Sequence, residues 1–144
     1  MRPIKFRCKR IDNGEWAIGH YADYIHPDCG IPSPSIIYPC PDYGNMIIAV
    51  DPSTVGQFTG LLDCKGNEIY EGDIVAHERE GSSLKYYREV VFHHGSFCFR
   101  FNFATYPMGD VRNISEWEIV GNIHDNPELI DIASKGMMEK GGGK

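Results

Sequence analysis

The sequence predicts a mainly β protein, and two observations carry that prediction. Short runs in which apolar and polar residues alternate, the pattern of half-buried strands, follow one another along the chain and are separated by Gly and Asn turns. No segment has the i, i+3, i+4 and i+7 apolar spacing of a long amphipathic helix. At 144 residues, the chain is long enough to bury a core without a metal or a disulfide. We therefore expect several short strands in a small barrel or sandwich.

Residues 1–56 are predicted to form an N-terminal β region. The stretch IKFRCKR alternates apolar and basic side chains, and the turn Asn13-Gly14 that follows it favours a tight hairpin. The chain returns in EWAIGHYADY and then enters residues 26–44, which contain five prolines. Because proline lacks a backbone donor, we expect 26–44 to be an irregular loop.

Residues 57–133 are predicted to form an SH3-like β-barrel region. In EIYEGDIV, Gly72 allows a sharp bend before a curved strand, and a long hairpin follows, which is typical of such a barrel. In the second strand of that hairpin, the phenylalanines at alternate positions from 97 to 103 are expected to face the core. HDNPELID predicts one short C-terminal helix with Asn126 as its N-cap, and 134–144 is predicted to be a flexible tail.

The net charge of −6 is distributed unevenly along the chain. The first ten residues carry five basic and no acidic side chains, whereas residues 11–78 carry one basic and eleven acidic side chains. A basic arm before an acidic body is a candidate contact for nucleic acid. The alternative is a strand whose basic side chains face water, since one short basic strand supplies few phosphate contacts.

The cysteines and histidines offer one candidate metal site. The five cysteines contain no CxxC pair and follow no secretory signal, so we expect reduced thiols in the cytosol. A zinc site could be assembled from His20, His26, Cys29 and Cys40, of which His26 and Cys29 have ligand-like spacing. No second closely spaced pair completes the set, so we expect no metal and no other cofactor.

Catalytic signatures are sparse. Glu71 and Asp73 could act as an acid–base pair, but no matched nucleophile accompanies them, and both residues also suit a turn. A Cys–His pair has no local signature, and no glycine-rich phosphate loop is present. Trp16 and Trp117 are expected to anchor the core. We therefore expect the protein not to be an enzyme.

Three blocks, taken in order, resemble the YopX family of phage and prophage proteins. They are IKFRCKRIDNGEWAIGHY, VDPSTVGQFTGLLDCKGNEIYEGDIV and WEIVGNIHDNPELI. The resemblance spans about residues 3–130 and leaves out the Pro-rich segment. It implies a small β-rich fold whose C-terminal part is similar to an SH3-type barrel, encoded in phage or prophage genomes. It implies no enzymatic activity and no catalytic residues.

We therefore expect a phage- or prophage-derived accessory protein that acts as a non-catalytic protein-binding module in the cytoplasm of the bacterial host. The candidate partner-binding residues come from the basic first strand and the Pro-rich segment, and they are Lys5, Arg7, Lys9, Tyr24, Tyr38 and Tyr43. The alternative is a nucleic-acid-binding barrel in which Arg100 and Arg112 join the basic strand on one positive face. A homodimer through exposed strand edges is open, and no apolar run is long enough to span a membrane.

Overall fold

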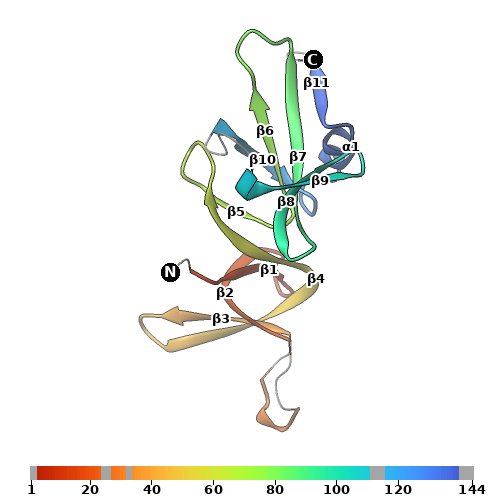
Figure 1. Ribbon diagram of the computed structural model, residues 1–144. Coiled ribbons are helices and arrows are strands. Elements are labelled where there is room, and N and C mark those ends of the chain that lie inside the picture. Colours follow the sequence, from red (N-terminus) through yellow and green to blue (C-terminus); the bar gives the residue numbers. More distant parts are fainter. Residues whose placement is uncertain (1–2, 24–26, 32–33, 111–115, 140–144) are drawn as a thin grey trace. The chain divides into compact units, whose positions relative to one another are not determined.

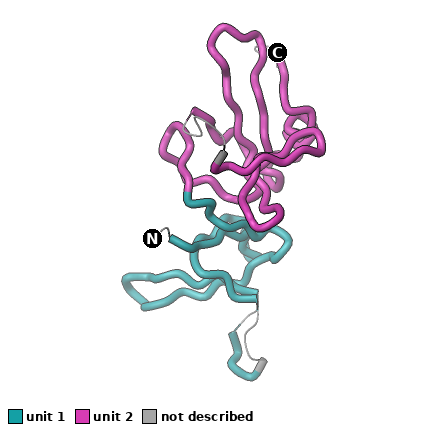
Figure 2. The backbone as a smooth tube through the Cα atoms, viewed as in Figure 1, with its two compact units in different colours: residues 1–60 teal, residues 61–144 magenta. Residues whose placement is uncertain are grey.

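The computed structural model describes residues 3–23, 27–31, 34–110 and 116–139 (Figure 1). The chain divides into two compact units, Met1–Gly60 and Leu61–Lys144 (Figure 2). Strands dominate both units, which confirms the predicted mainly β class; the SH3-like detail stays a prediction. In chain order the elements are β1 (Phe6–Arg10), β2 (Trp16–Ala22), η1 (Pro27–Cys29), β3 (Ser35–Cys40), β4 (Gly44–Leu62), β5 (Glu68–Tyr70), β6 (Asp73–Glu78), β7 (Leu84–His93), β8 (Ser96–Phe101), β9 (Ala104–Pro107), η2 (Met108–Asp110), β10 (Glu118–Asn122), α1 (Glu128–Lys135) and β11 (Met137–Glu139).

In the first unit, four strands form a closed series of antiparallel pairings, because the last strand pairs with the first. β1 pairs with β2, β2 with β3, β3 with β4, and β4 again with β1. The 19-residue β4 can serve both partners because its first half pairs with β3 and its second half with β1. The core inside consists of Cys8, Ala17, Ile36 and Val50, with Phe6, Tyr21, Tyr38, Ile48 and Val55 packed against them.

A large bulge in β4 separates its pairings on either side of Cys8. Arg7 pairs with Gly56 and Lys9 with Asp51, so four residues of β4 lie opposite Cys8 alone. The Cys8 thiol donates to the Asp51 carbonyl over 2.9 Å, and the Thr54 hydroxyl accepts the Lys9 backbone N–H over 2.9 Å. These bonds satisfy polar groups that the interrupted ladder would otherwise leave unpaired.

The prediction of an irregular loop over 26–44 is wrong for its second half. β3 occupies Ser35–Cys40 and forms a hairpin with the start of β4. The β-branched and aromatic run in SIIYPC favours a strand, and its one internal proline, Pro39, lies near the strand end, where a lost ladder bond is tolerated. The other described prolines of 26–44, Pro27, Pro34 and Pro41, lie in η1 or flank β3, so they do not interrupt the pairing.

The second unit contains a sheet ordered β10-β6-β7-β8-β9, with β11 paired to β7. Its buried cluster consists of Ile69, Val75, Val90, Phe99, Met108 and Trp117. The bend predicted at Gly72 is confirmed: its φ is +89°, its N–H donates to the Val90 carbonyl over 2.8 Å, and its carbonyl accepts the Ile123 N–H over 2.9 Å. Strand β7 and the residue that follows β10 therefore hold this turn in place.

Two details of the second unit differ from the sequence prediction. The phenylalanine stripe is core only in part: Phe99 is buried, but Phe103 is fully exposed because β8 ends at Phe101 and the chain turns there. The predicted N-cap residue, Asn126, instead uses its side-chain oxygen to accept the Asn122 N–H over 3.2 Å.

The structure differs from the predicted C-terminal tail and places the division of the chain close to the predicted domain boundary. Within the predicted tail, 134–144, Met137–Glu139 forms β11 because these residues find an antiparallel partner in β7. The predicted boundary after residue 56 and the division after Gly60 both fall inside β4. In the described parts of the chain, no helix is long and apolar enough to cross a membrane.

Candidate partner-binding site

Three basic residues in and just before β1 lie over aromatic rings. Because side chains alternate along a strand, Lys5, Arg7 and Lys9 share one face, whereas Phe6 and Cys8 face the core. The Arg7 Cζ lies 4.6 Å and the Lys9 Nζ 5.4 Å from the centre of the Trp16 ring. The Lys5 Nζ lies 5.1 Å from the centre of the Phe58 ring. All three cations are half-buried, so they are held at the surface by their rings.

The position of Trp16 follows from the register of the first hairpin. The hairpin predicted around Asn13-Gly14 is confirmed, although its connection is the four residues 11–14, closed by the Arg10 N–H, which donates to the Glu15 carbonyl. The hairpin pairs Lys9 with Trp16 and Arg7 with Ile18. Trp16 is therefore on the basic face, and the prediction that it anchors the core is wrong. We call Lys5, Arg7, Lys9, Trp16 and Ile18 the basic–aromatic face; Ile18, 45% exposed, is its apolar part.

A cavity of about 300 Å³ adjoins this face. β2 pairs with β3 only from His20 to Ala22, where Gly19 allows the strands to come so close that a Cβ would clash with the Ile37 carbonyl. Before Gly19, β2 has no residue paired with β3, and the cavity lies beside this part of β2. Its lining residues are Arg10, Trp16, Ala17, Ile18 and Tyr38.

The cation that lines this cavity is fixed by a carboxylate. Arg10 donates to both oxygens of Asp12, over 2.9 and 2.7 Å. This hydrogen bond lowers the pKa of Asp12 and raises that of Arg10, so the pair stays charged. The cavity therefore combines two aromatic rings, an aliphatic side chain and an oriented guanidinium.

The structure brings together only some of the predicted binding residues. Tyr38 lines the cavity beside Trp16, on which Arg7 and Lys9 lie. Tyr43 is 79% exposed in the turn between β3 and β4 and is not among the lining residues. Tyr24 lies outside the described residues. Sequence reasoning missed Trp16, Ile18 and Arg10, which the hairpin register at Asn13-Gly14 could have placed.

The zinc candidates do not form a described cluster. His20 and Cys29 are exposed and Cys40 is half-buried, while His26 lies outside the described residues. Among the residues that the structure describes, no group of three His, Cys, Asp or Glu side chains is placed to hold a metal ion. The Cys8 thiol is not one of these candidates; it is buried in the core of the first unit, and burial raises its pKa above the ordinary value.

Asp73, one residue of the candidate acid–base pair, is 1% exposed. Its carboxylate accepts the Tyr70 N–H over 2.8 Å. This short-range hydrogen bond is typical of a residue that stabilises a turn.

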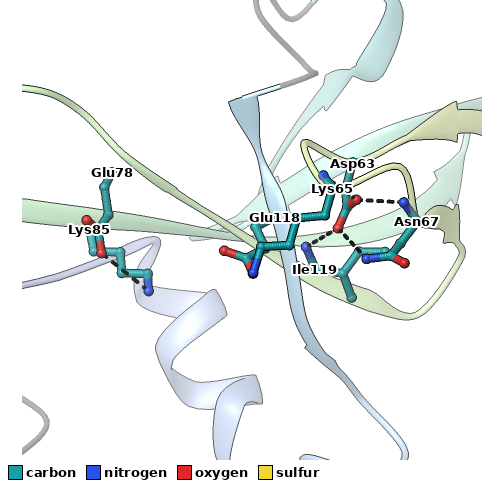
Figure 3. Close-up of polar contacts among 7 residues, drawn as sticks. All are labelled: Asp63, Lys65, Asn67, Glu78, Lys85, Glu118 and Ile119. Carbon is teal, nitrogen blue, oxygen red and sulfur yellow. Dashed lines mark hydrogen bonds and ion pairs between the residues drawn. The ribbon is translucent and has the colours of Figure 1, made fainter.

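A second buried carboxylate, Asp63, organises a turn in the second unit (Figure 3). Its oxygens accept the N–H groups of Lys65, Asn67 and Ile119 over 2.8 to 3.1 Å. Burial on its own raises the pKa of Asp63, but these hydrogen bonds outweigh it and hold the pKa below its ordinary value. Asp63 is therefore a charged anchor that ties the turn before β5 to β10.

Arg100 and Arg112 are the other basic residues of the nucleic-acid hypothesis. In the part of the chain that the structure describes, neither extends a positive surface. Arg100 is in an ion pair with Glu89 at 2.8 Å, which compensates its charge. Arg112 lies outside the described residues.

The family of the chain can be stated from its sequence match. The family model described as YopX protein matches residues 6–131. The chain belongs to the YopX family. Among solved structures, it is similar to protein EF1440 from Enterococcus faecalis, with 22% identity, a TM-score of 0.54, and coverage of 90% of this chain and 99% of that chain. At this identity the likeness shows a shared fold, and no curated protein matches the chain. The matched range includes the whole basic–aromatic face except Lys5.

Proposed function

We propose that this YopX-family protein is a phage- or prophage-derived accessory protein that binds an acidic protein segment without catalysis. The observation that carries the proposal is the row of three cations held over Trp16 and Phe58 beside an aromatic-lined cavity.

The spacing of the cations favours an extended partner. Basic side chains two residues apart on one strand are about 6.6 Å apart, which is also the spacing of alternate side chains on a second extended chain. An extended segment with carboxylates at alternate positions therefore matches Lys5, Arg7 and Lys9 one to one. Because the rings already restrain the cations, binding costs less side-chain entropy than binding to free lysines.

The cavity supplies the second part of recognition. An apolar side chain of the partner fits between Trp16, Ile18 and Tyr38, while the nearby cations contact its carboxylates. Peptide-binding domains combine such a pocket with an extended contact, in which the pocket determines specificity.

The same geometry favours a protein over a nucleic acid. Proteins that bind single strands stack bases on open aromatic rings. Arg7 and Lys9 already lie over Trp16, and three cations on one strand supply few phosphate contacts. Nucleic-acid binding is the rival outcome of the test.

The test is a titration of the full chain with two probes, a peptide of alternating glutamate and valine and an oligothymidylate. We expect the peptide to bind, and the triple substitution K5A/R7A/K9A to weaken binding at least about tenfold. The matched control is K65A/R79A/K85A, which removes three exposed or half-exposed cations from the second unit and should leave the affinity unchanged. Equal losses in both variants, or tight binding of the oligothymidylate alone, would contradict the proposal.

A capture experiment extends the test to natural partners. Intact protein is used as bait in extracts of prophage-induced host cells, with and without nuclease. We expect a discrete protein that resists nuclease, is lost with K5A/R7A/K9A and is kept with the control variant. A capture that nuclease abolishes would indicate nucleic acid instead.

A further inference from the structure

The turn between β8 and β9 carries a strained and fully exposed phenylalanine. Phe101 pairs with Ala104, so the connection consists of Asn102 and Phe103 alone, with φ of +46° and +65°. A two-residue turn with positive φ at both positions favours Asn and Gly, and a phenylalanine is strained there. The Phe103 side chain is also fully exposed to solvent. An aromatic residue kept in an unfavourable backbone conformation and in water points to a contact outside the unit.

A cavity of about 270 Å³ lies beside this phenylalanine. Its apolar lining includes Phe101 of β8 and Ile130 and Ala133 of α1, and Phe103 lies at its edge. The turn and the helix are connected, because the Asn102 N–H donates to the Ser134 carbonyl over 2.7 Å. The surface therefore offers a protruding ring and an apolar hollow in one fixed arrangement.

Charges of both signs also line this cavity. Glu89 and Arg100 are lining residues, and they pair with each other at 2.8 Å. Half of the Arg100 side chain is exposed and can also reach a carboxylate outside the chain, whereas the Glu89 side chain is 13% exposed and reaches the surface only in part. A partner of a single sign would match only one of the two groups, whereas a second copy of this surface matches both.

We propose that this face joins two copies of the chain about a two-fold axis. Across such an axis residue i contacts residue j and residue j contacts residue i, so a surface with a ring, a hollow and both charges is complementary to itself. Phe103 of each copy enters the cavity of the other copy. Arg100 of each copy then faces Glu89 of the other.

The first test measures self-association by sedimentation velocity over a wide concentration range. We expect the wild-type chain to dimerise and Phe103→Gly to weaken dimerisation at least about tenfold. Because glycine adopts positive φ without strain, the thermal stability of the Phe103→Gly monomer should be unchanged or higher. Tyr43→Ser is the control, since it removes an exposed aromatic residue from the turn between β3 and β4 and should leave dimerisation unchanged.

The second test exchanges the charges. Arg100→Glu places two carboxylates opposite each other across the axis, and Glu89→Arg places two guanidinium groups there, so each variant alone should be monomeric. An equimolar mixture of the two restores both opposite-charge contacts and should dimerise. Mixing cannot repair a folding defect, so recovery identifies a contact between chains.

Three results would overturn the proposal. They are a wild-type chain that stays monomeric at every concentration, equal effects of Phe103→Gly and Tyr43→Ser, and a charge-exchange mixture that associates no better than its components. The first of these would leave the surface to a different partner.

Discussion

The two units bury side chains of different size. The main buried cluster of the first unit is made of Cys8, Ala17, Ile36 and Val50, with Phe58 buried apart from it, and the main-chain pairings of this unit return to β1. The second unit buries Phe99, Met108 and Trp117 together with aliphatic residues. Larger buried side chains contribute more free energy of unfolding, so we assign most of the core stability to the second unit.

The tryptophans make the difference most visible. Trp117 is 8% exposed and contacts the Phe99 ring at 5.1 Å in the second unit. Trp16 lies at the surface of the first unit under two cations. One ring therefore stabilises a core, while the other shapes a binding face, although both are aromatic residues in or beside a strand.

The largest effect is expected from Trp117→Ala. It removes a buried ring from the main cluster of the second unit and should lower the free energy of unfolding by about 3–5 kcal/mol. Urea denaturation followed by circular dichroism measures it. A loss below about 1 kcal/mol would show that the second unit does not depend on this core.

A smaller loss is expected from Asp63→Ala. The substitution leaves the N–H groups of Lys65, Asn67 and Ile119 without their acceptor, which should cost about 1–3 kcal/mol. Asp12→Ala is the matched control in the first unit, since it removes an exposed carboxylate and its ion pair and should cost much less than Asp63→Ala. Equal losses in denaturant titrations would contradict the anchoring role of Asp63.

The smallest effect is a pH dependence from the same carboxylate. The folded pKa of Asp63 is lowered, so its contribution is fully present above the pKa of about 3.9 that aspartate has in the unfolded chain. The contribution is lost as the pH falls below that value and through the folded pKa. Unfolding free energies measured between neutral and acidic pH should fall less steeply for Asp63→Ala than for the wild type. Parallel pH profiles for the two proteins would show that folding does not lower the pKa of Asp63.

Local turn chemistry was the most predictable part of the fold. Asn13-Gly14 and His94-Gly95 both lie in hairpin connections. His94-Gly95 is a two-residue turn with positive φ at both positions, whereas Asn13-Gly14 ends a four-residue connection in which Gly14 has positive φ. Gly72 marks a bend for the same reason. β3 was missed because its pairing with β4 overrides the effect of the neighbouring prolines, and such pairing is a tertiary property.

The candidate site was predictable only in part. Alternation along the first strand places Lys5, Arg7 and Lys9 on one face. The rings beneath them come from β2 and β4, and their positions depend on strand register and on the bulge opposite Cys8. Phe103 was assigned to the core because a period-2 pattern does not reveal where a strand ends.

The most direct test of the division between the units is Trp16→Ala, measured for both binding and stability. Since the ring is half-buried at the surface, we expect the free energy of unfolding to fall by less than about 2 kcal/mol. Affinity for the alternating glutamate–valine peptide should fall at least about tenfold, because Arg7 and Lys9 lose their support and the cavity loses a wall. A stability loss as large as that of Trp117→Ala, with peptide affinity unchanged, would contradict the account.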